Sequence, residues 1–292
     1  MDASACRADA ARTGHDADRP PLRQSLLKRR KLAEITRLLG VTAGLRCLDL
    51  GADNGVVSHL LRQRGGQWTS ADLDEEAVAS IRRLVGERVY RLHPGPTPFA
   101  TDAFDRVVIV DLLEHVHDDR AFVAELFRVL RPGGELIVNV PHWREGLLRR
   151  LRLAVGQTDD KHGHVRPGYT PGTLRALLDG RFEVLAERTY NKAASELLDI
   201  VTRAATELLK GRRPNGAKGA VLVEEDFRRH RGLFALYAVS EPLARSFAAL
   251  DALFFRAQGY MLIVKARSRK QASAPAGRPP APREEQPRCG CW

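Results

Sequence analysis

The chain has 292 residues, of which 43% are hydrophobic and 28% charged, and its formal net charge is +11. This composition predicts a globular protein with one large domain, or one domain carrying an insertion. It excludes a transmembrane helix, because no stretch of about 18 apolar residues is free of charge, and a secretory leader, because the N-terminus has no apolar core. Three of the four cysteines fall in predicted tails, so we expect no disulfide framework and a reducing, cytoplasmic setting.

The positive charge permits contact with nucleic acid or an anionic membrane but indicates neither, since a biased base composition also produces Arg-rich and Ala-rich proteins. The chain has no recognisable RNA-binding module, and 6% aromatic residues are few for stacking on bases. We therefore do not expect a nucleic-acid partner.

The N-terminal part contains a tail and a helix. Residues 1–21 are polar and end in two prolines, which predicts a disordered tail. Leucine and isoleucine then recur with a helical period over Ser25–Leu39, and Gly40 ends this predicted helix.

The stretch Arg46–Leu60, RCLDLGADNGVVSHL, predicts a strand, a tight loop and a helix in immediate succession. Gly51 and Gly55 tolerate left-handed backbone and allow the loop to approach a ligand closely. The first amides of the helix then point at that ligand, which suits negative charge or hydrogen-bond acceptors.

A second apolar run, Trp68–Ala71, ends in the acidic group Asp72-Leu73-Asp74. A carboxylate about 20 residues beyond a glycine loop is placed to accept hydrogen bonds from ribose hydroxyls. The pattern predicts a nucleoside cofactor other than NAD(P), because the loop lacks a third glycine and Asp53 would stand beside a pyrophosphate. A cationic cofactor without phosphate fits better.

Strands and helices alternate along the rest of the core, which predicts a doubly wound parallel sheet. The remaining predicted strands are Arg88–Leu92, Asp105–Val110, Glu135–Val140, Phe182–Arg188 and Gly259–Ala266. The predicted helices are Val56–Arg64, Glu75–Val85, Asp118–Leu130, Gly146–Val155 and one that begins at Thr170–Pro171. In such a sheet the ligand binds at the carboxyl ends of the strands, where the first and fourth strands diverge.

These motifs resemble a class I S-adenosylmethionine (SAM)-dependent methyltransferase of the broad bacterial small-molecule type. The resemblance rests on LDLGADNG, SADLDEEAV, FDRVVIVDLLEHV and LFRVLRPGGELIVNVPH, in this order, and covers roughly residues 30–190 plus the last strand. It implies a seven-stranded, mostly parallel, Rossmann-like sheet with a helical insertion before the last strand. One departure is Asp53, where the family has glycine, although aspartate adopts left-handed backbone more readily than most residues.

The resemblance also implies roles for particular residues. The cofactor would be bound by Asp49, Gly51, Asp53, Gly55, Asp72, Leu73 and Asp111, with Asp72 on the ribose and Asp49 orienting the loop or meeting the ligand's ammonium group through water. Related enzymes place an acid against the adenine after the third strand; none stands here, so backbone groups or His93 would serve.

The catalytic candidates are His142, His115 and Asp111. His142 would act as general base for a hydroxyl nucleophile, since the ordinary pKa of histidine lies near working pH. His162 and His164 are alternatives, although loop histidines are often only solvated.

Asp111-x-x-Glu114-His115 directly follows the fourth strand. On one helical turn these side chains share a face and suit Mg²⁺ or a similar divalent ion. The set resembles the Glu-x-x-Glu-His site of metal-assisted O-methyltransferases of the quinone-precursor and small-RNA 3′-end types. The alternative is structural, with Glu114 capping and His115 packed near the substrate. We favour the structural alternative and assign no metal.

The interval Tyr190–Gln258 is too long for the short hairpin that usually joins the last two strands, and its composition predicts helices. The expected organisation is a disordered tail (1–21), a SAM-binding core (22–190), a helical insertion (191–258), the last core strand (259–267) and a second disordered tail (268–292). We expect the insertion to form a lid over a hydrophobic acceptor; a dimer surface and a contact with the inner face of the membrane are alternatives.

The sequence thus predicts an enzyme that methylates an oxygen of a hydrophobic or lipid-linked small molecule. One alternative is a non-catalytic protein of the same fold that binds partners through the insertion, and another is a metal-assisted O-methyltransferase of the RNA or quinone type. The acceptor and the oligomeric state stay open.

Overall fold

The computed structural model describes residues 26–52, 54–155, 164–198, 200–201, 251 and 257–271. Both predicted tails lie largely outside these residues. Asp53, His162 and nearly all of the predicted insertion also lie outside them.

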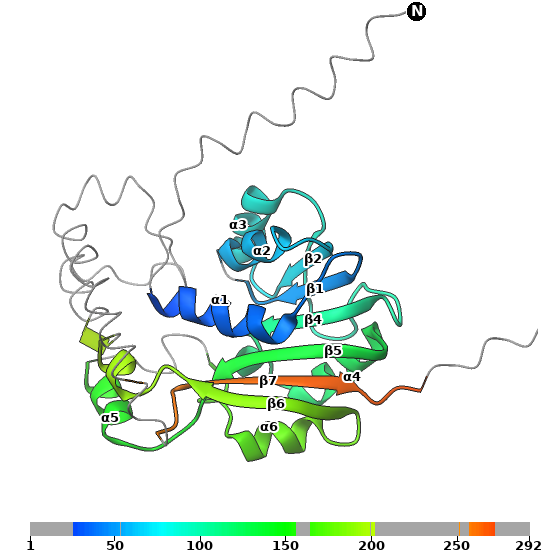
Figure 1. Cartoon of the computed structure of the whole chain (residues 1–292). Coiled ribbons are helices and arrows are strands. Elements are labelled where there is room, and N and C mark those ends of the chain that lie inside the picture. The colour runs from blue at the N-terminus through cyan, green and yellow to red at the C-terminus, as the bar shows by residue number, and fades with distance from the viewer. Residues whose placement is uncertain are drawn as a thin grey trace, which may run out of the picture.

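Seven strands form one sheet in the order β3-β2-β1-β4-β5-β7-β6 (Figure 1). They are β1 Arg46–Leu50, β2 Gln67–Asp72, β3 Val89–Arg91, β4 Phe104–Val110, β5 Leu130–Pro141, β6 Phe182–Tyr190 and β7 Met261–Ser268. The first five strands are parallel, and β7 runs antiparallel to both β5 and β6. The structure confirms the predicted doubly wound, mostly parallel sheet.

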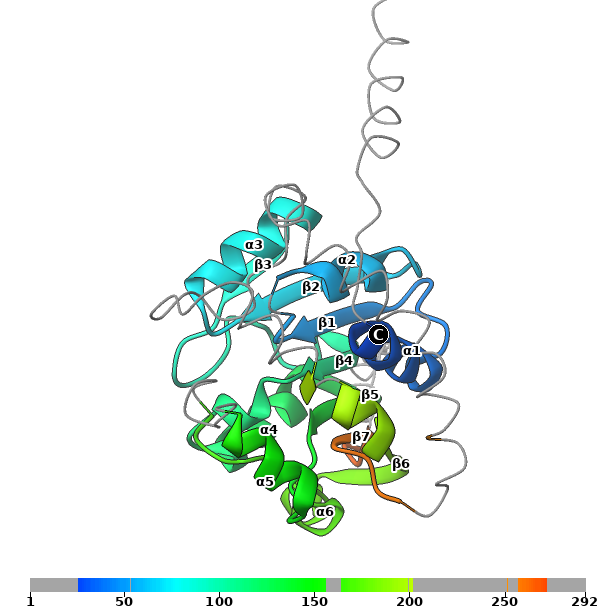
Figure 2. The same ribbon diagram turned by 90° about the vertical axis from the view of Figure 1, so that its left-hand side faces the viewer.

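Helices cover both faces of this sheet (Figure 1 and Figure 2). Side chains of α1 (Leu26–Leu39) and α2 (Val56–Arg62) share one hydrophobic cluster, and those of α4 (Asp119–Val129) and α6 (Pro171–Leu178) share another. The helix α3 (Glu75–Val85) packs beside α2, and α5 (Leu147–Ala154) follows β5. A short 3-10 turn, η1, spans Leu113–His115.

Neighbouring residues of a central strand point into opposite clusters. Cys47 and Val108 belong to the cluster beneath α1 and α2, whereas Leu48 and Val107 belong to the cluster beneath α4 and α6. Since side chains of a strand alternate between the two faces, a strand that is covered on both must be apolar throughout. The near-continuous apolar runs of β1 and β4 have this cause.

The structure differs from the prediction at β5. The strand was predicted to begin at Glu135, but pairing between Phe104 and Leu130 extends it back to Leu130. A register shift between Phe104 and Arg106 accompanies the extension. A β-bulge of this kind absorbs an irregular segment without ending the pairing of two strands.

Asp251, a described residue near the end of the predicted insertion, links the start of the insertion to α1. The carboxylate of Asp251 is buried and accepts the backbone amides of Lys192 and Ala194 at 2.9 and 3.0 Å. It also pairs with Arg30 of α1 at 3.3 Å.

Within the described parts of the chain, no helix combines the length and the apolar character that a bilayer crossing requires.

Candidate functional site

The loop between β1 and α2 lies at the carboxyl edge of the sheet. Gly51 has φ +79, and a Cβ at this position would come within 2.3 Å of the Val110 carbonyl oxygen. Gly55 has φ +80, and a Cβ there would lie 2.7 Å from Cα of Ile81 in α3. Both positions require glycine because the loop is pressed between the end of β4 and the helix α3.

Asp49 is a buried carboxylate beneath this loop. It accepts hydrogen bonds from the hydroxyls of Ser58 at 2.8 Å and Ser70 at 3.0 Å, and it pairs with Arg62 at 3.3 Å. Burial raises the pKa of Asp49 to about 6, against the opposite effect of Arg62 and the two serines. These contacts tie β1, β2 and α2 together, which suits the orienting role expected for Asp49.

Asp72 ends β2 beside the loop. Strand pairing sets Leu50 opposite Ala71, and the Gly51 amide donates to the Ala71 carbonyl at 3.1 Å, so the following residue, Asp72, lies next to Gly51. Its side chain is buried and accepts the amide of Asp74 at 3.2 Å. Leu73 packs against the core cluster beneath α4 and α6. The structure therefore brings together the loop and the carboxylate that the sequence predicted.

Asp111 follows β4 at the same edge. It adopts a left-handed backbone with φ +47. Its carboxylate accepts the side-chain amide of Asn139 at 2.9 Å and forms an ion pair with Lys31 of α1. The hydroxyl of Tyr190 donates to the Asn139 amide oxygen at 2.5 Å, which completes a chain of polar side chains from β6 to α1.

The structure corrects the expected geometry of the Asp111-x-x-Glu114-His115 block. These residues do not lie on one helical turn, because Asp111 is left-handed and the 3-10 turn begins only at Leu113. Asp111 is therefore held by Lys31, while Glu114 and His115 gather with His164 instead. Local spacing predicted the wrong partner for these two residues.

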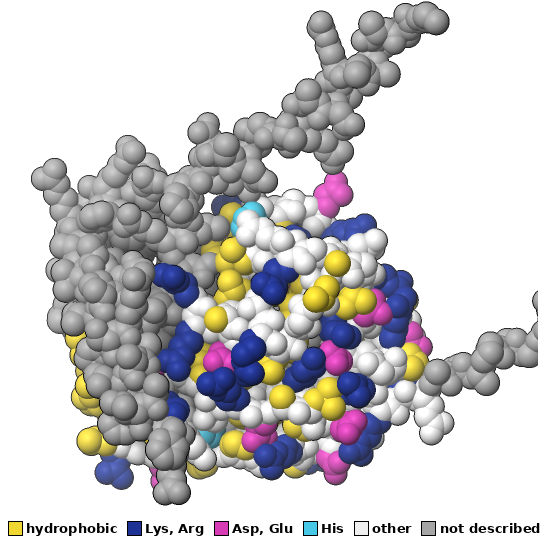
Figure 3. All heavy atoms as spheres, in the orientation of Figure 1, with side chains coloured by type: hydrophobic (Ala, Val, Ile, Leu, Met, Phe, Trp, Pro, Cys, Tyr) yellow, Lys and Arg dark blue, Asp and Glu magenta, His cyan; other side chains and the backbone are white. Residues whose placement is uncertain are grey.

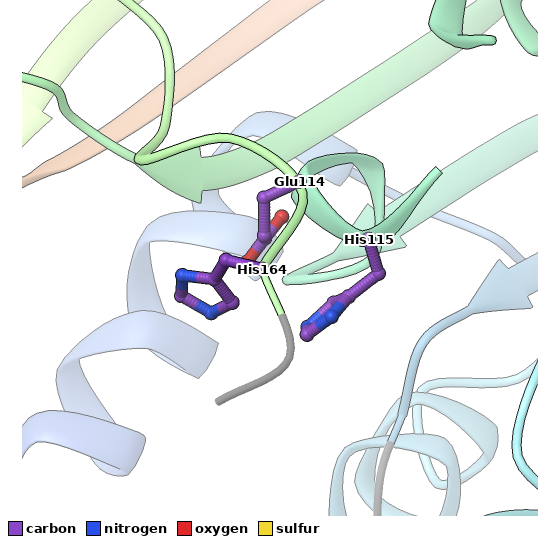
Figure 4. Close-up of side chains that lie close together, drawn as sticks. All are labelled: Glu114, His115 and His164. Atoms are coloured by element: carbon purple, nitrogen blue, oxygen red, sulfur yellow. The ribbon is translucent and has the colours of Figure 1, made fainter. Parts of the chain in front are cut away.

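Glu114, His115 and His164 converge on the same space (Figure 4). The Glu114 side chain is 1% exposed, and within the described part of the chain neither of its oxygens has a hydrogen-bond partner. Burial raises the pKa of the Glu114 carboxyl to about 8; Asp111 adds to this effect, and Lys31 and Arg166 oppose it.

His142 directly follows β5 and is buried. One ring nitrogen, Nδ1, lies 2.7 Å from the Gly259 carbonyl oxygen. A carbonyl can only accept, so Nδ1 carries the hydrogen, and in the neutral ring Nε2 keeps its lone pair. The geometry leaves His142 able to accept a proton at Nε2.

Sequence reasoning missed two members of this region, Lys31 and Asn139. Lys31 falls inside a predicted helix and Asn139 inside a predicted strand, and neither was predicted to belong to the site. The one available signal was the placement of an asparagine in an otherwise apolar strand that is covered on both faces, where a polar side chain needs a partner.

The sheet order, the loop pressed against β4 and the acidic end of β2 agree with the Rossmann-like fold that the resemblance to class I methyltransferases implies. Residues 48–138 match the family model described as a methyltransferase domain. This match spans about a third of the chain and agrees with the resemblance of the sequence motifs to SAM-dependent methyltransferases.

Among the known proteins with similar sequences are methyltransferases named for quinone substrates or quinone biosynthesis. The chain is 34% identical over 131 residues to a ubiquinone biosynthesis O-methyltransferase of Xanthomonas oryzae pv. oryzae, which covers 42% of this chain and 54% of that protein. It is 39% identical over 107 residues to a demethylmenaquinone methyltransferase of Clavibacter sepedonicus, covering 35% and 44%. The chain thus spans about half the length of the curated relatives it matches.

A solved structure of similar architecture is a SAM dependent methyltransferase from Archaeoglobus fulgidus. The TM-score is 0.51 at 15% identity, with 84% of this chain and 96% of that chain covered. At this identity the likeness supports the fold alone.

Proposed function

We propose that this chain is a SAM-dependent methyltransferase that methylates an oxygen of a hydrophobic or lipid-linked small molecule. The observation that carries the proposal is the buried carboxylate of Asp72 beside the Gly51–Gly55 loop. A carboxylate in this position accepts ribose hydroxyls, and the loop leaves room for a ligand to approach the backbone.

SAM, when bound, supplies a methyl group on a positively charged sulfur. The chain's contribution is to hold the acceptor oxygen in line with that methyl group at about 3–3.5 Å, since positioning alone lowers a barrier by roughly 7–11 kcal/mol. Asp111, fastened by Lys31 and Asn139, contributes a carboxylate at the end of β4 beside the loop.

His142 is the proposed general base. Its Nε2 takes the proton of the acceptor hydroxyl as the new oxygen–carbon bond forms and the carbon–sulfur bond breaks. The Gly259 carbonyl keeps the ring in the required tautomer. A His142→Gln variant is expected to lose about 10²- to 10⁴-fold in kcat while SAM affinity stays unchanged. An unchanged kcat would remove His142 from this role.

Two observations support the acceptor class. The relative named as an O-methyltransferase supports oxygen, and both relatives' names support a quinone-type acceptor. In addition, α5 exposes Leu147 by 80% and Leu151 by 37%, and no residue of this helix is buried. Arginines stand between these leucines. A helix with exposed leucines and arginines suits the surface of an anionic membrane, where a lipid-linked acceptor resides.

The net positive charge does not by itself favour a nucleic-acid acceptor. On the face drawn in Figure 3, Lys and Arg side chains are interspersed with Asp and Glu. Recognition of a nucleic-acid backbone instead uses basic residues clustered on one face.

Calorimetry with SAM and with S-adenosylhomocysteine measures whether the protein binds the proposed cofactor. A protein that binds neither is not a methyltransferase, and the alternative, a non-catalytic protein acting through the insertion, would then stand.

For the acceptor, a catechol with a prenyl chain is compared with the same catechol without it, using labelled SAM. We expect a higher kcat/KM for the prenylated compound and the label on oxygen. Equal kcat/KM values, or label on a ring carbon, would contradict the acceptor class.

Sedimentation with vesicles containing anionic phospholipid tests the membrane contact. The wild-type protein is expected to sediment with these vesicles, and a Leu147→Ser/Leu151→Ser variant to stay largely in solution. A Val41→Ser variant, which removes an exposed apolar side chain outside α5, is the matched control. Equal sedimentation of all three proteins would remove α5 from this role.

A further inference from the structure

In the part of the chain that the structure describes, the buried carboxylate of Glu114 lacks the hydrogen bonds that a buried polar group normally makes. It is 1% exposed, and neither oxygen accepts a hydrogen bond from the described residues. Burying a polar group without a hydrogen-bond partner is unfavourable, and more so when the group is charged. Native proteins retain such groups mainly where a ligand, an ion or a functional step satisfies them.

The two neighbouring rings supply ligands of the kind a metal ion uses. One donor atom from each of Glu114, His115 and His164 lies within 4.8 Å of the others. The carboxylate and the two rings point into a common space, as Figure 4 shows. Tetrahedral coordination with bonds of about 2.0–2.1 Å sets donors about 3.4 Å apart, so each pair of donor atoms needs to close by at most about 1.4 Å.

The segment that carries His164 is fastened to the 3-10 turn. The Val165 amide donates to the Glu114 carbonyl at 3.0 Å. The guanidinium of Arg166 donates to the Leu113 carbonyl at 3.1 Å and to the His117 carbonyl at 2.9 Å. The Val165 amide and the Arg166 guanidinium therefore hold His164 beside Glu114, and neither contact depends on the His164 ring.

We propose that Glu114, His115 and His164 bind a divalent transition-metal ion through one carboxylate oxygen and two imidazole nitrogens. Two imidazoles with one carboxylate suit Zn²⁺, Co²⁺, Mn²⁺ or Fe²⁺ better than Mg²⁺, which takes mostly oxygen ligands and water. Three protein ligands leave a coordination position for water or an acceptor oxygen. Asp111 is not a ligand, because Lys31 and Asn139 hold its carboxylate.

The test measures metal binding directly, so its result does not depend on the proposed methyl transfer. Co²⁺ is titrated into the full chain, without an affinity tag, and its visible absorption is recorded. The background carries Cys6→Ser, Cys289→Ser and Cys291→Ser, which removes thiols outside the described residues. Cys47 is retained, because it is fully buried and burial raises the pKa of its thiol to about 12.

We expect one equivalent of Co²⁺ with a spectrum of nitrogen and oxygen ligation. Glu114→Gln and His164→Gln should each weaken binding by about tenfold or more. His117→Gln, an exposed histidine two residues beyond His115, is the matched control and should bind as the wild type does. If circular dichroism shows that Glu114→Gln does not fold, the comparison is made with His164→Gln alone. Absence of Co²⁺ binding, or equal affinity in the wild type and the His164→Gln variant, would overturn the proposal.

Discussion

Replacing Asp72 by asparagine is the sharpest test of the cofactor site. The wild-type carboxylate is 7% exposed, so its hydrogen bonds are little weakened by solvent. A hydrogen bond to a charged group contributes about 1.5–3 kcal/mol, and asparagine loses the charge and offers one acceptor oxygen instead of two. We therefore expect SAM affinity to fall by about 10- to 100-fold.

The same variant keeps the local fold. The wild-type Oδ1 accepts the Asp74 amide at 3.2 Å, and the asparagine oxygen can accept it equally. Calorimetry with S-adenosylhomocysteine measures the affinity, and thermal unfolding without ligand checks the fold. Glu75→Gln is the control, because Glu75 lies three residues on and only forms an exposed ion pair with Arg91. Equal affinity of the Asp72→Asn variant and the wild type would show that the pocket is misplaced.

Three further predictions concern the stability of the folded protein. Gly51→Ala should lower the free energy of unfolding in urea by about 2–4 kcal/mol, because φ is +79 and the new Cβ would meet the Val110 carbonyl; a loss below 0.5 kcal/mol would contradict this. Hydrogen bonding to Arg128 lowers the pKa of Glu125 to about 2, so the stabilisation is present above pH 4.5 and is lost as pH falls toward 2. Glu125→Gln should thus cost about 1–2 kcal/mol at pH 7 after allowance for solvent screening, and a pH series of unfolding curves should show the difference vanish near pH 2; a constant difference would refute the pairing. Tyr190→Phe removes a hydroxyl that donates to a buried asparagine amide, and should lower stability by about 1–2 kcal/mol in thermal unfolding; an unchanged Tm would show that this bond contributes nothing.

The sequence by itself determined the strands and the glycine loop between β1 and α2. The central strands are covered by helices on both faces, so their apolar runs appear directly in the sequence. Gly51 and Gly55 were recognisable because the backbone needs positive φ and close packing at these positions. Asp72 was recognisable because it ends an apolar run at a fixed spacing from the loop. All of these patterns are local, so they can be recognised in the sequence without knowledge of the fold.

Only the tertiary structure decided how the polar residues are paired. Lys31 meets Asp111 although 80 residues separate them, and Asn139 reaches the same carboxylate from another strand. His164 lies beside Glu114 because the Val165 amide and the Arg166 guanidinium hold its segment on the 3-10 turn. Helical spacing predicted a different set, because it assumed a regular turn where Asp111 is left-handed. Pairing between distant segments depends on how the elements pack in space, and the spacing of residues along a chain does not contain this information.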